Sequence, residues 1–386
     1  MWQRRFEPNN WGFPPHNRAS FQNVQALFPT ARLRRGGGPV IPFARAFREL
    51  SGVTFVGPDG NTQTVSEMLN TTYTDAWVVL KDGTIVAEDY RNGMADDSHH
   101  LLNSVSKSFL GMLAGVLAAD GTLDPSAPLT RYLPEFTGTA LTQTTVQHAL
   151  DMTAAVRYDE NYADPAADFS RETAVVGWRN PHNGKPAAPS LLAFACALSD
   201  VDHADGTHFH YRTVLTNVIG MAIERATGQS LADLMEARIW QRLRPEQDAA
   251  VVVDRTGFPY FGAGMNACAR DLARFGQLLL GNGCYGGEQV VPATWVQDTV
   301  RGNNELRAQF AASDYGGMLA GGHYHNQVWA AADRGVMYCL GIHGQIIYVN
   351  QAARVVIVKL STHPNPAQGE LFASAFAAMD AVAAAL

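Results

Sequence analysis

The chain has 386 residues, of which 46% are hydrophobic, and a net charge of −7. That length suits two domains, or one large domain with an insertion, around a substantial core. The acidic balance, without basic runs interleaved with aromatic residues, excludes a nucleic-acid partner, and no apolar run is long enough for a membrane span, so we expect no membrane partner either.

The N-terminal residues and the cysteines bear on the cellular compartment. Arg4 and Arg5 begin like a twin-arginine signal, but residues 7–10 are polar where such a signal requires an apolar stretch. We therefore expect a cytoplasmic protein. Reduced thiols fit better than a disulfide framework or a zinc cluster, because the four cysteines are scattered without short spacings. They are Cys196, Cys268, Cys284 and Cys339.

The first part of the chain predicts an arm followed by a β-hairpin. Residues 1–50 are rich in Pro, Gly, Arg and Asn, which indicates an extended arm on the surface. Strands are predicted at 76–80 and 84–88, because these apolar runs flank Lys81-Asp82-Gly83 and Asp-Gly is a typical hairpin turn.

Ser104 and Lys107 stand at the start of an apolar helix predicted over 105–117, and Lys107 is one of only four lysines among 29 basic residues. An offset of three places both side chains on one face of the first turn. A serine hydroxyl becomes a nucleophile when a neutral amine takes its proton. Keeping lysine neutral near pH 7 requires a pKa shift of roughly three units, about 4 kcal/mol, which an enclosed site supplies. The alternative is a Ser N-cap followed by a solvated lysine.

Residues 120–245 carry helical patterns and lack strand patterns. Helices are predicted at 145–152, 190–198 and 217–226. Three histidines near an Asp-Gly-Thr turn raise the question of a metal site, but no His-Glu-x-x-His or Cys-x-x-Cys pattern supports one, so we expect neither a metal nor a cofactor. These are His203, His208 and His210.

Tyr211 lies at a loop-to-helix junction, shortly before the helix at 217–226. A tyrosine in that position can project its hydroxyl toward a neighbouring site and relay a proton between a serine, a lysine and a leaving group. The alternative is a packed aromatic residue whose hydroxyl is satisfied.

The C-terminal part predicts a helix at 267–278, strands at 344–350 and 354–361, and a helix at 370–386. Gly341 lies just before the first of these strands. A glycine there lets a substrate approach the main chain, and the next N–H can face a developing oxyanion. An ordinary edge strand with a bulge is the alternative.

Strands at both ends of the chain with helices between them predict an α/β (α+β) fold. We expect an antiparallel sheet built from the N- and C-terminal segments and flanked by helices, plus an inserted, mainly helical domain. The sheet domain would comprise 1–100 and 246–386, the helical domain 101–245, and the active site would lie at their interface.

The three elements, in this order, resemble the serine β-lactamase and penicillin-binding protein superfamily. Its signature is Ser-x-x-Lys at a helix start, then Tyr-x-Asn or Tyr-x-Ser, then a Lys-Thr-Gly or His-x-Gly strand. Within it, the chain looks like the 6-aminohexanoate-dimer hydrolases, the nylon-oligomer hydrolases of the class C-like branch that also contains family VIII carboxylesterases. The resemblance extends from about residue 16 onward and is carried by the segments 16–18, 104–108, 158–165, 177–179, 269–274 and 341–345.

This resemblance implies a β-lactamase/transpeptidase-like fold and a hydrolase that needs no cofactor. Ser104 would be the acylated nucleophile, Lys107 its general base, and Tyr211 the proton relay to the leaving group. The backbone N–H groups of Ser104 and Ile342 would form the oxyanion hole. The substrate-binding residues would be Tyr162, in a loop that folds over the substrate, together with Trp178, Gly341 and His343.

Three positions depart from the family's pattern. Tyr211-Arg212-Thr213 lacks the Asn of the β-lactamases. The Lys of Lys-Thr-Gly falls on Cys339 when Gly341 is the motif glycine, which disfavours recognition of a β-lactam or peptide carboxylate. The acidic side chain that assists binding of a charged amine, some eleven residues beyond Tyr162, is Thr173 here, which favours esterase over nylon-dimer amidase activity.

We therefore expect a serine hydrolase that cleaves an ester or amide bond of a small molecule through an acyl-enzyme. The alternatives are a β-lactamase or D,D-peptidase-type activity and a non-catalytic ligand-binding protein of the same fold. The chain contains no Gly-x-Ser-x-Gly motif, which excludes an α/β-hydrolase. The sequence does not determine whether the chain forms a homodimer.

Overall fold

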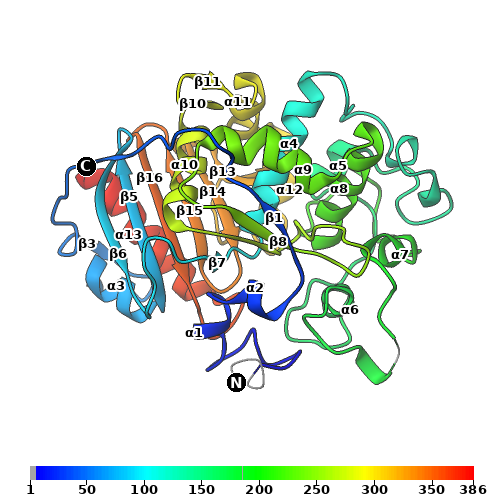
Figure 1. Cartoon of the computed structure of the whole chain (residues 1–386), viewed down its shortest axis with the longest axis horizontal. Helices are drawn as coiled ribbons and strands as arrows, with labels where there is room; N and C mark the ends of the chain where they lie inside the picture. The colour runs from blue at the N-terminus through cyan, green and yellow to red at the C-terminus, as the bar shows by residue number, and fades with distance from the viewer. Residues whose placement is uncertain (1–5, 185) are drawn as a thin grey trace.

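The computed structural model describes residues 6–184 and 186–386. Its centre is an eight-stranded sheet that combines both ends of the chain (Figure 1). Neighbouring strands are antiparallel, except for the parallel pair β2–β6. In spatial order the strands are β12 (His323–His325), β13 (Val328–Ala331), β14 (Val336–Gly341), β15 (Gln345–Asn350), β16 (Val355–Ser361), β5 (Thr74–Lys81), β6 (Thr84–Tyr90) and β2 (Ala44–Arg45).

The pairing of β16 with β5 joins the two ends of the chain. Its register runs from Val355 opposite Lys81 to Ser361 opposite Thr74. Every residue of β16 is buried, as expected for a central strand covered on both faces. The predicted C-terminal strands correspond to β15 and β16, so that part of the sequence interpretation is confirmed.

The predicted hairpin is also confirmed, as β5 and β6. Asp82 and Gly83 at its turn have φ of 49° and 75°. Two consecutive positive φ angles are what a two-residue hairpin turn of the favoured twist requires.

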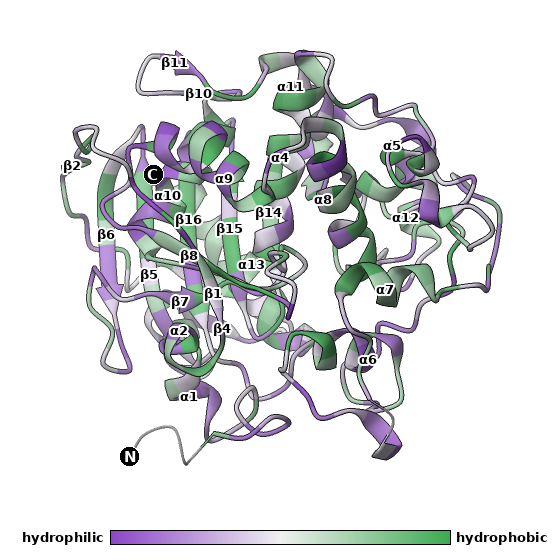
Figure 2. Ribbon diagram, turned by 45° about the vertical axis from the view of Figure 1, so that its right-hand side comes forward, coloured by the Kyte–Doolittle hydropathy of each residue, from purple (hydrophilic) through white to green (hydrophobic). Residues whose placement is uncertain are grey.

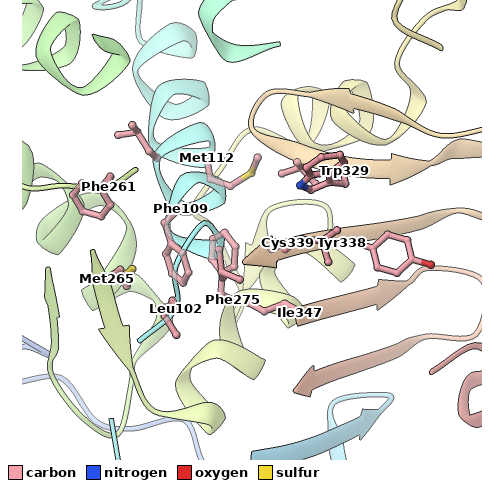
Figure 3. Packing of buried hydrophobic residues seen from close by; sticks show 14 of the residues in the cluster. Leu102, Phe109, Met112, Phe261, Met265, Phe275, Trp329, Tyr338, Cys339 and Ile347 are labelled. Atoms are coloured by element: carbon pink, nitrogen blue, oxygen red, sulfur yellow. The ribbon is translucent and has the colours of Figure 1, made fainter. Parts of the chain in front are cut away.

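Helices cover both faces of this sheet, which gives three layers (Figure 1). On one face, the rings of Phe109 and Phe275 stack with centroids 3.8 Å apart, close to Ile347 of β15 (Figure 3). On the other face, the Tyr348 hydroxyl donates to Asp380 at 2.9 Å. The helices concerned are α4 (Val105–Ala119) and α10 (Ala269–Leu280) on the first face and α13 (Gly369–Ala385) on the second.

A second, four-stranded sheet corrects the expectation of an N-terminal arm on the surface. Trp11, Phe21 and Leu33 are buried in the core, although the arm is mostly loop. The arm also supplies the first strand of this sheet. Strands of two to four residues are too short to show an alternating pattern, which explains why the sequence did not reveal them. Their order is β1 (Thr30–Leu33), β8 (Ala249–Val252), β9 (Met265–Ala267) and β7 (His100–Leu101).

The described residues between 120 and 245 form helices and loops and no strand, as predicted. The longest helix, α8, is buried along most of its length and ends at Gly228, whose φ is 67°. These elements are η2 (Leu129–Arg131), η3 (Pro134–Phe136), α5 (Val146–Leu150), α6 (Asp168–Val175), η4 (His182–Gly184), α7 (Leu191–Cys196), α8 (Thr213–Thr227), α9 (Leu231–Met235), η5 (Glu236–Trp240) and η6 (Gln241–Leu243).

The remaining elements are short and were not predicted, because none carries a long periodic pattern. They are α1 (Asn17–Ser20), α2 (Val24–Leu27), β3 (Thr54–Val56), β4 (Thr62–Thr64), α3 (Val65–Thr71), β10 (Cys284–Tyr285), β11 (Glu288–Gln289), α11 (Ala293–Arg301), α12 (Asn304–Ala311) and η7 (Ala332–Arg334).

Hydrophobic residues concentrate in the middle of the molecule. Figure 2 shows predominantly hydrophobic ribbon in β14, β15 and β16 and more hydrophilic ribbon in β6 near the edge. Within the described residues, none of the helices combines the length and apolar character needed to cross a bilayer.

The close approach of α4 to the β12–β13 turn gives a stability prediction. A Cβ on Gly111 would lie 2.1 Å from the Asn326 carbonyl oxygen, a backbone atom that cannot move aside cheaply. We expect Gly111→Ala to lower the free energy of unfolding by about 1–3 kcal/mol through overpacking, measured by denaturant unfolding. Gly369→Ala is the control, because a Cβ there meets nothing within 4 Å. Equal stability of the two variants would contradict the packing argument.

Candidate active site

Ser104 lies between β7 and α4, where the chain leaves the small sheet and enters the helix that packs on the large one. It occupies the N-cap position of α4, yet its side chain makes no capping hydrogen bond. Asn103 precedes it with φ of 46°, a conformation that asparagine tolerates better than most residues. The hydroxyl of Ser104 is therefore available for other partners, and the residue is only 9% exposed.

Lys107 is enclosed and directed at that hydroxyl. Its Nζ donates to Ser104 Oγ at 2.9 Å and to Thr213 Oγ1 at 3.1 Å, and it also donates to the Gly262 carbonyl. The residue is 1% exposed. The alternative of a capping serine with a solvated lysine is inconsistent with this arrangement.

Burial and nearby carboxyl groups act in opposite directions on the amine. Desolvation lowers the pKa of Lys107 to about 8, while the charges of Glu160 and Glu172 raise it. Glu160 is itself buried, which raises the pKa of its carboxyl. Burial also raises the pKa of Glu172 to about 8. An amine in this setting is neutral in a large fraction of molecules near pH 8.

Thr213, at the start of α8, connects Lys107 to Glu160. The Thr213 N–H donates to Glu160 Oε2 at 2.7 Å, and its hydroxyl donates to Glu160 Oε1. The same hydroxyl oxygen accepts from Lys107. A hydroxyl that donates to a carboxylate and accepts from an amine fixes the position of the amine.

Tyr211, two residues before Thr213, also lies beside Lys107. Lys107 Nζ is 5.1 Å from the centre of its ring, and the ring stacks on Trp329 of β13 with centroids 5.3 Å apart. Burial raises the pKa of the Tyr211 phenol well above the usual value, and the nearby Ser104 side chain lowers it by less. The phenol is therefore protonated at neutral pH and able to donate.

The end of β14 approaches the backbone of Ser104. A Cβ on Gly341 would lie 2.4 Å from the Leu102 carbonyl oxygen and 3.1 Å from Ser104 N, so only glycine fits. In the part of the chain that the structure describes, neither the Ser104 N–H nor the Ile342 N–H donates to a backbone carbonyl. Two N–H groups at this junction are thus left for an external acceptor.

His343 anchors the turn that follows β14 through its backbone N–H and its ring. Its N–H donates to the Pro366 carbonyl at 2.8 Å, and its Nδ1 lies 2.7 Å from the His363 carbonyl oxygen. Burial lowers the pKa of His343 to about 4, so the imidazole is neutral at pH 7. Its ring packs edge-on against Phe21, with centroids 5.2 Å apart.

Two pockets meet at Tyr162, Ile342 and Pro366. The first, about 210 Å³, is the catalytic pocket, and it contains Ser104, Tyr211 and Gly341. The second pocket, termed the side pocket, has a volume of about 50 Å³, and its lining includes Trp178 and His343. The structure thus places Tyr162 and Gly341 beside the serine, and it places Trp178 and His343 in the adjoining side pocket. The other residues lining the catalytic pocket are Asp314, Tyr315, Met318, Trp329, Leu340, Ala367, Gly369 and Phe372.

Comparison with known proteins identifies the family. Residues 62–379 match the family described as Beta-lactamase. The chain belongs to the beta-lactamase family. It is 34% identical to the 6-aminohexanoate-dimer hydrolase of Paenarthrobacter ureafaciens over 359 residues, which cover 93% of this chain and 88% of that protein.

Solved structures agree with this family assignment. A protein from Bacillus anthracis, named as a candidate 6-aminohexanoate-dimer hydrolase, aligns with a TM-score of 0.89 at 26% identity and covers 98% of this chain and 97% of its own. A family VIII carboxylesterase shares the fold, with a TM-score of 0.55 at 14% identity over 81% and 96% of the two chains. The predicted family and fold class are confirmed, and the chain is a serine hydrolase of amide or ester bonds.

Cys339 is the residue that the sequence interpretation assigns to the Lys of Lys-Thr-Gly when Gly341 is taken as the motif glycine. The thiol is fully buried, and burial raises its pKa to about 12. It is neutral at pH 7, so β14 presents no positive charge to the catalytic pocket. The four cysteines are free thiols.

The sequence did not indicate three of the residues that surround Lys107. Glu160 was part of a recognised segment but carried no predicted role, and Thr213 was noted only as a departure from Asn. Gly262 acts through its carbonyl, which leaves no mark in side-chain chemistry. The sequence does contain one signal for Thr213. It lies only two residues after Tyr211, at the same helix start, so it could be expected to lie near the same site.

The histidines near the Asp-Gly-Thr turn have protein partners. His203 and His208 pack with ring centroids 4.8 Å apart, and His203 Nε2 lies 3.1 Å from Arg212 Nη2. Among residues 6–184 and 186–386, no group of three or more His, Cys, Asp or Glu side chains is arranged to hold a metal ion.

The pKa of Lys107 gives a prediction for the pH dependence of this beta-lactamase family member. Below a pH of about 8 the amine carries a proton and cannot accept another from Ser104. We expect kcat/KM for a neutral ester to fall about tenfold per pH unit below that value and to level off above it. A rate independent of pH between about pH 5 and about pH 9 would show that Lys107 is not the titrating base.

A variant of Glu160 tests the cause of this profile. The Glu160 charge raises the pKa of Lys107, so Glu160→Gln should shift the acidic limb of the profile to lower pH. Glu305→Gln, at an exposed position of α12, is the matched control and should leave the limb in place. The measurement is kcat/KM against pH for the three proteins.

Proposed function

We propose that this hydrolase cleaves a small ester or amide through an acyl-enzyme on Ser104. The observation that carries the proposal is the 2.9 Å hydrogen bond between Lys107 Nζ and a Ser104 hydroxyl that caps no helix. Neutral Lys107 accepts the serine proton while Ser104 Oγ forms a bond to the substrate carbonyl carbon. The carbonyl oxygen becomes an oxyanion, which the N–H groups of Ser104 and Ile342 stabilise.

Collapse of this intermediate breaks the bond to the leaving group. Tyr211 donates its phenolic proton to the departing alcohol or amine and regains one from the protonated Lys107. Water then attacks the acyl-enzyme carbonyl and gives a proton to Lys107, which passes it to Ser104 Oγ as the bond between Ser104 and the acyl group breaks and the acid is released. The protonated phenol of Tyr211 and its contact with both Ser104 and Lys107 support this role.

The substrate that fits best is a small, linear or lightly branched molecule. The catalytic pocket of about 210 Å³ is lined mainly by aromatic and aliphatic side chains, which suits an apolar acyl or leaving group. The similarity to a 6-aminohexanoate-dimer hydrolase supports a linear aliphatic chain.

Ester cleavage is proposed as the stronger activity. At Thr173 the hydroxyl donates to the Phe169 and Ser170 carbonyls of its own helix, so no charged group stands there to hold an amine. The neighbouring Glu172 faces away, toward Tyr158 and Asn217. Because Cys339 provides no cation for a β-lactam carboxylate, we place β-lactamase or D,D-peptidase action second.

A cytoplasmic location is part of the proposal. Its support is that all four cysteines are free, as is usual in a reducing compartment.

Ser104→Ala tests the nucleophile. We expect it to reduce turnover of a short p-nitrophenyl ester by roughly a thousandfold or more and to abolish the mass increase produced by a fluorophosphonate, with the fold intact. The matched control is Ser106→Ala, two residues further along, whose hydroxyl donates to the Asn103 carbonyl. This variant should still be labelled. Labelling of Ser104→Ala would exclude Ser104 as the nucleophile.

Paired substrates test the bond preference. The p-nitrophenyl ester and the p-nitroanilide of hexanoic acid share one acyl group and differ only in the atom that leaves. We expect a higher kcat/KM for the ester, because no charged group beside Thr173 assists a leaving amine. A higher kcat/KM for the anilide would reverse the proposed order.

A further inference from the structure

The side pocket contains a cation without a carboxylate partner. Its lining combines the N-terminal arm, the segment after α6 and the turn that follows β14. Arg179 is the only residue in this lining that is charged at pH 7, since His343 is neutral. The remaining lining residues are Asn9, Trp11, Gly12, Phe13, Phe21, Asn103, Tyr162, Phe169, Thr173, Trp178, Ile342 and Pro366.

Arg179 is held in place entirely by neutral groups. Its guanidinium donates to Ser170 Oγ at 2.5 Å and to the Tyr162 carbonyl at 2.7 Å. It also lies 5.9 Å and 5.8 Å from the ring centres of Phe13 and Phe169. Within the described ranges, no Asp or Glu lies within ion-pair distance of it, whereas Arg270 and other buried arginines have such partners.

A cation in this position is energetically unusual. Arg179 is partly buried, and desolvation lowers its pKa; the Tyr260 phenol opposes this effect, and no carboxylate does so. Arginine nevertheless stays protonated in proteins, so the side pocket keeps an uncompensated positive charge. Buried charges in proteins are normally paired, and an unpaired one beside a catalytic cleft indicates a place for an anionic ligand group.

A second donor in the same lining is also without a partner. Trp178 is 5% exposed, and its indole N–H has no hydrogen-bond partner among the residues that the structure describes. The indole nitrogen is itself shielded from solvent, so Trp178 contributes its ring to the wall of the side pocket, and the guanidinium of Arg179 supplies the donors. A guanidinium suits a carboxylate, which accepts several hydrogen bonds at once.

We propose that the side pocket binds a carboxylate of the substrate through Arg179. The side pocket joins the catalytic pocket at Tyr162, Ile342 and Pro366, so one extended molecule reaches both. The side pocket has a volume of about 50 Å³, which holds a small terminal group but no aromatic ring of the substrate. This inference rests on the proposed function, and it specifies the substrate class as an ester or amide that carries a free carboxylate some distance from the scissile bond.

Matched substrates with and without a negative charge test the proposal. The first series consists of p-nitrophenyl half-esters of linear dicarboxylic acids of increasing length, each paired with its methyl-capped form. The second pair is 4-acetoxybenzoate and its methyl ester, which places the carboxylate on the leaving group. The readout is the ratio of kcat/KM for the charged member to that for the neutral member.

We expect one chain length to show a ratio above that of its neighbours, and Arg179→Gln to lower that ratio about 10- to 100-fold, mainly through KM. Arg179→Lys should restore part of it. Arg171→Gln is the control, because Arg171 lies on α6 but pairs with Asp168 and lines neither pocket. A ratio that Arg179→Gln leaves unchanged overturns the proposal. An equal loss for charged and neutral esters also overturns it, because Arg179 would then only hold the Tyr162 carbonyl.

A binding measurement separates this inference from the proposed function. Adipate binding to the Ser104→Ala protein, with and without Arg179→Gln, is followed by calorimetry. We expect Arg179→Gln to weaken binding at least about tenfold. This result would support the carboxylate site even if the enzyme hydrolysed none of the esters, in which case the proposed function alone would fail. Equal adipate affinity in both proteins would overturn the carboxylate site while leaving acylation of Ser104 untouched.

Discussion

An amine enclosed against a hydroxyl is the interaction on which the rest of this structure depends. Lys107 Nζ donates to Ser104 Oγ, and an exposed lysine would be protonated at any physiological pH. Burial brings its pKa down to about 8, and the charges of Glu160 and Glu172 oppose that change. The site therefore balances two requirements. The amine must be dry enough to lose its proton near neutral pH, and basic enough to take one from a serine.

The balance requires segments that are distant in the sequence. Lys107 comes from α4, whereas Thr213 begins α8 and Gly262 precedes β9. The ring of Tyr211 links this helical part to the large sheet by stacking on Trp329. Because the walls of the lysine's enclosure come from several separate segments, loosening any one of these segments would admit water. Water would restore the normal pKa of the amine and remove the base, so fold stability and catalysis are coupled at this point.

Part of this arrangement could be predicted from the sequence. The parts that could not be predicted have physical explanations. The offset between Ser104 and Lys107 is set by helix geometry alone, and long apolar runs indicated β15 and β16. Contacts that depend on tertiary packing could not be read in this way. Nothing local distinguishes Glu160, which is buried behind Thr213, from the exposed acids around it. The four-stranded sheet was not predicted, because each of its strands is too short to show the two-residue alternation of a β-strand. The burial of the N-terminal arm was not predicted, because its buried aromatic residues are separated by loop residues.

The distribution of charge along the cleft determines how a substrate would lie in it. The thiol of Cys339 and the imidazole of His343 are both neutral, so the edge of β14 carries no fixed charge. Lys107 is neutral in its active form, which leaves Arg179 as the positive group in the described lining of the two pockets. A carboxylate is thus attracted to the side pocket, and this attraction orients the molecule so that its uncharged carbonyl faces Ser104.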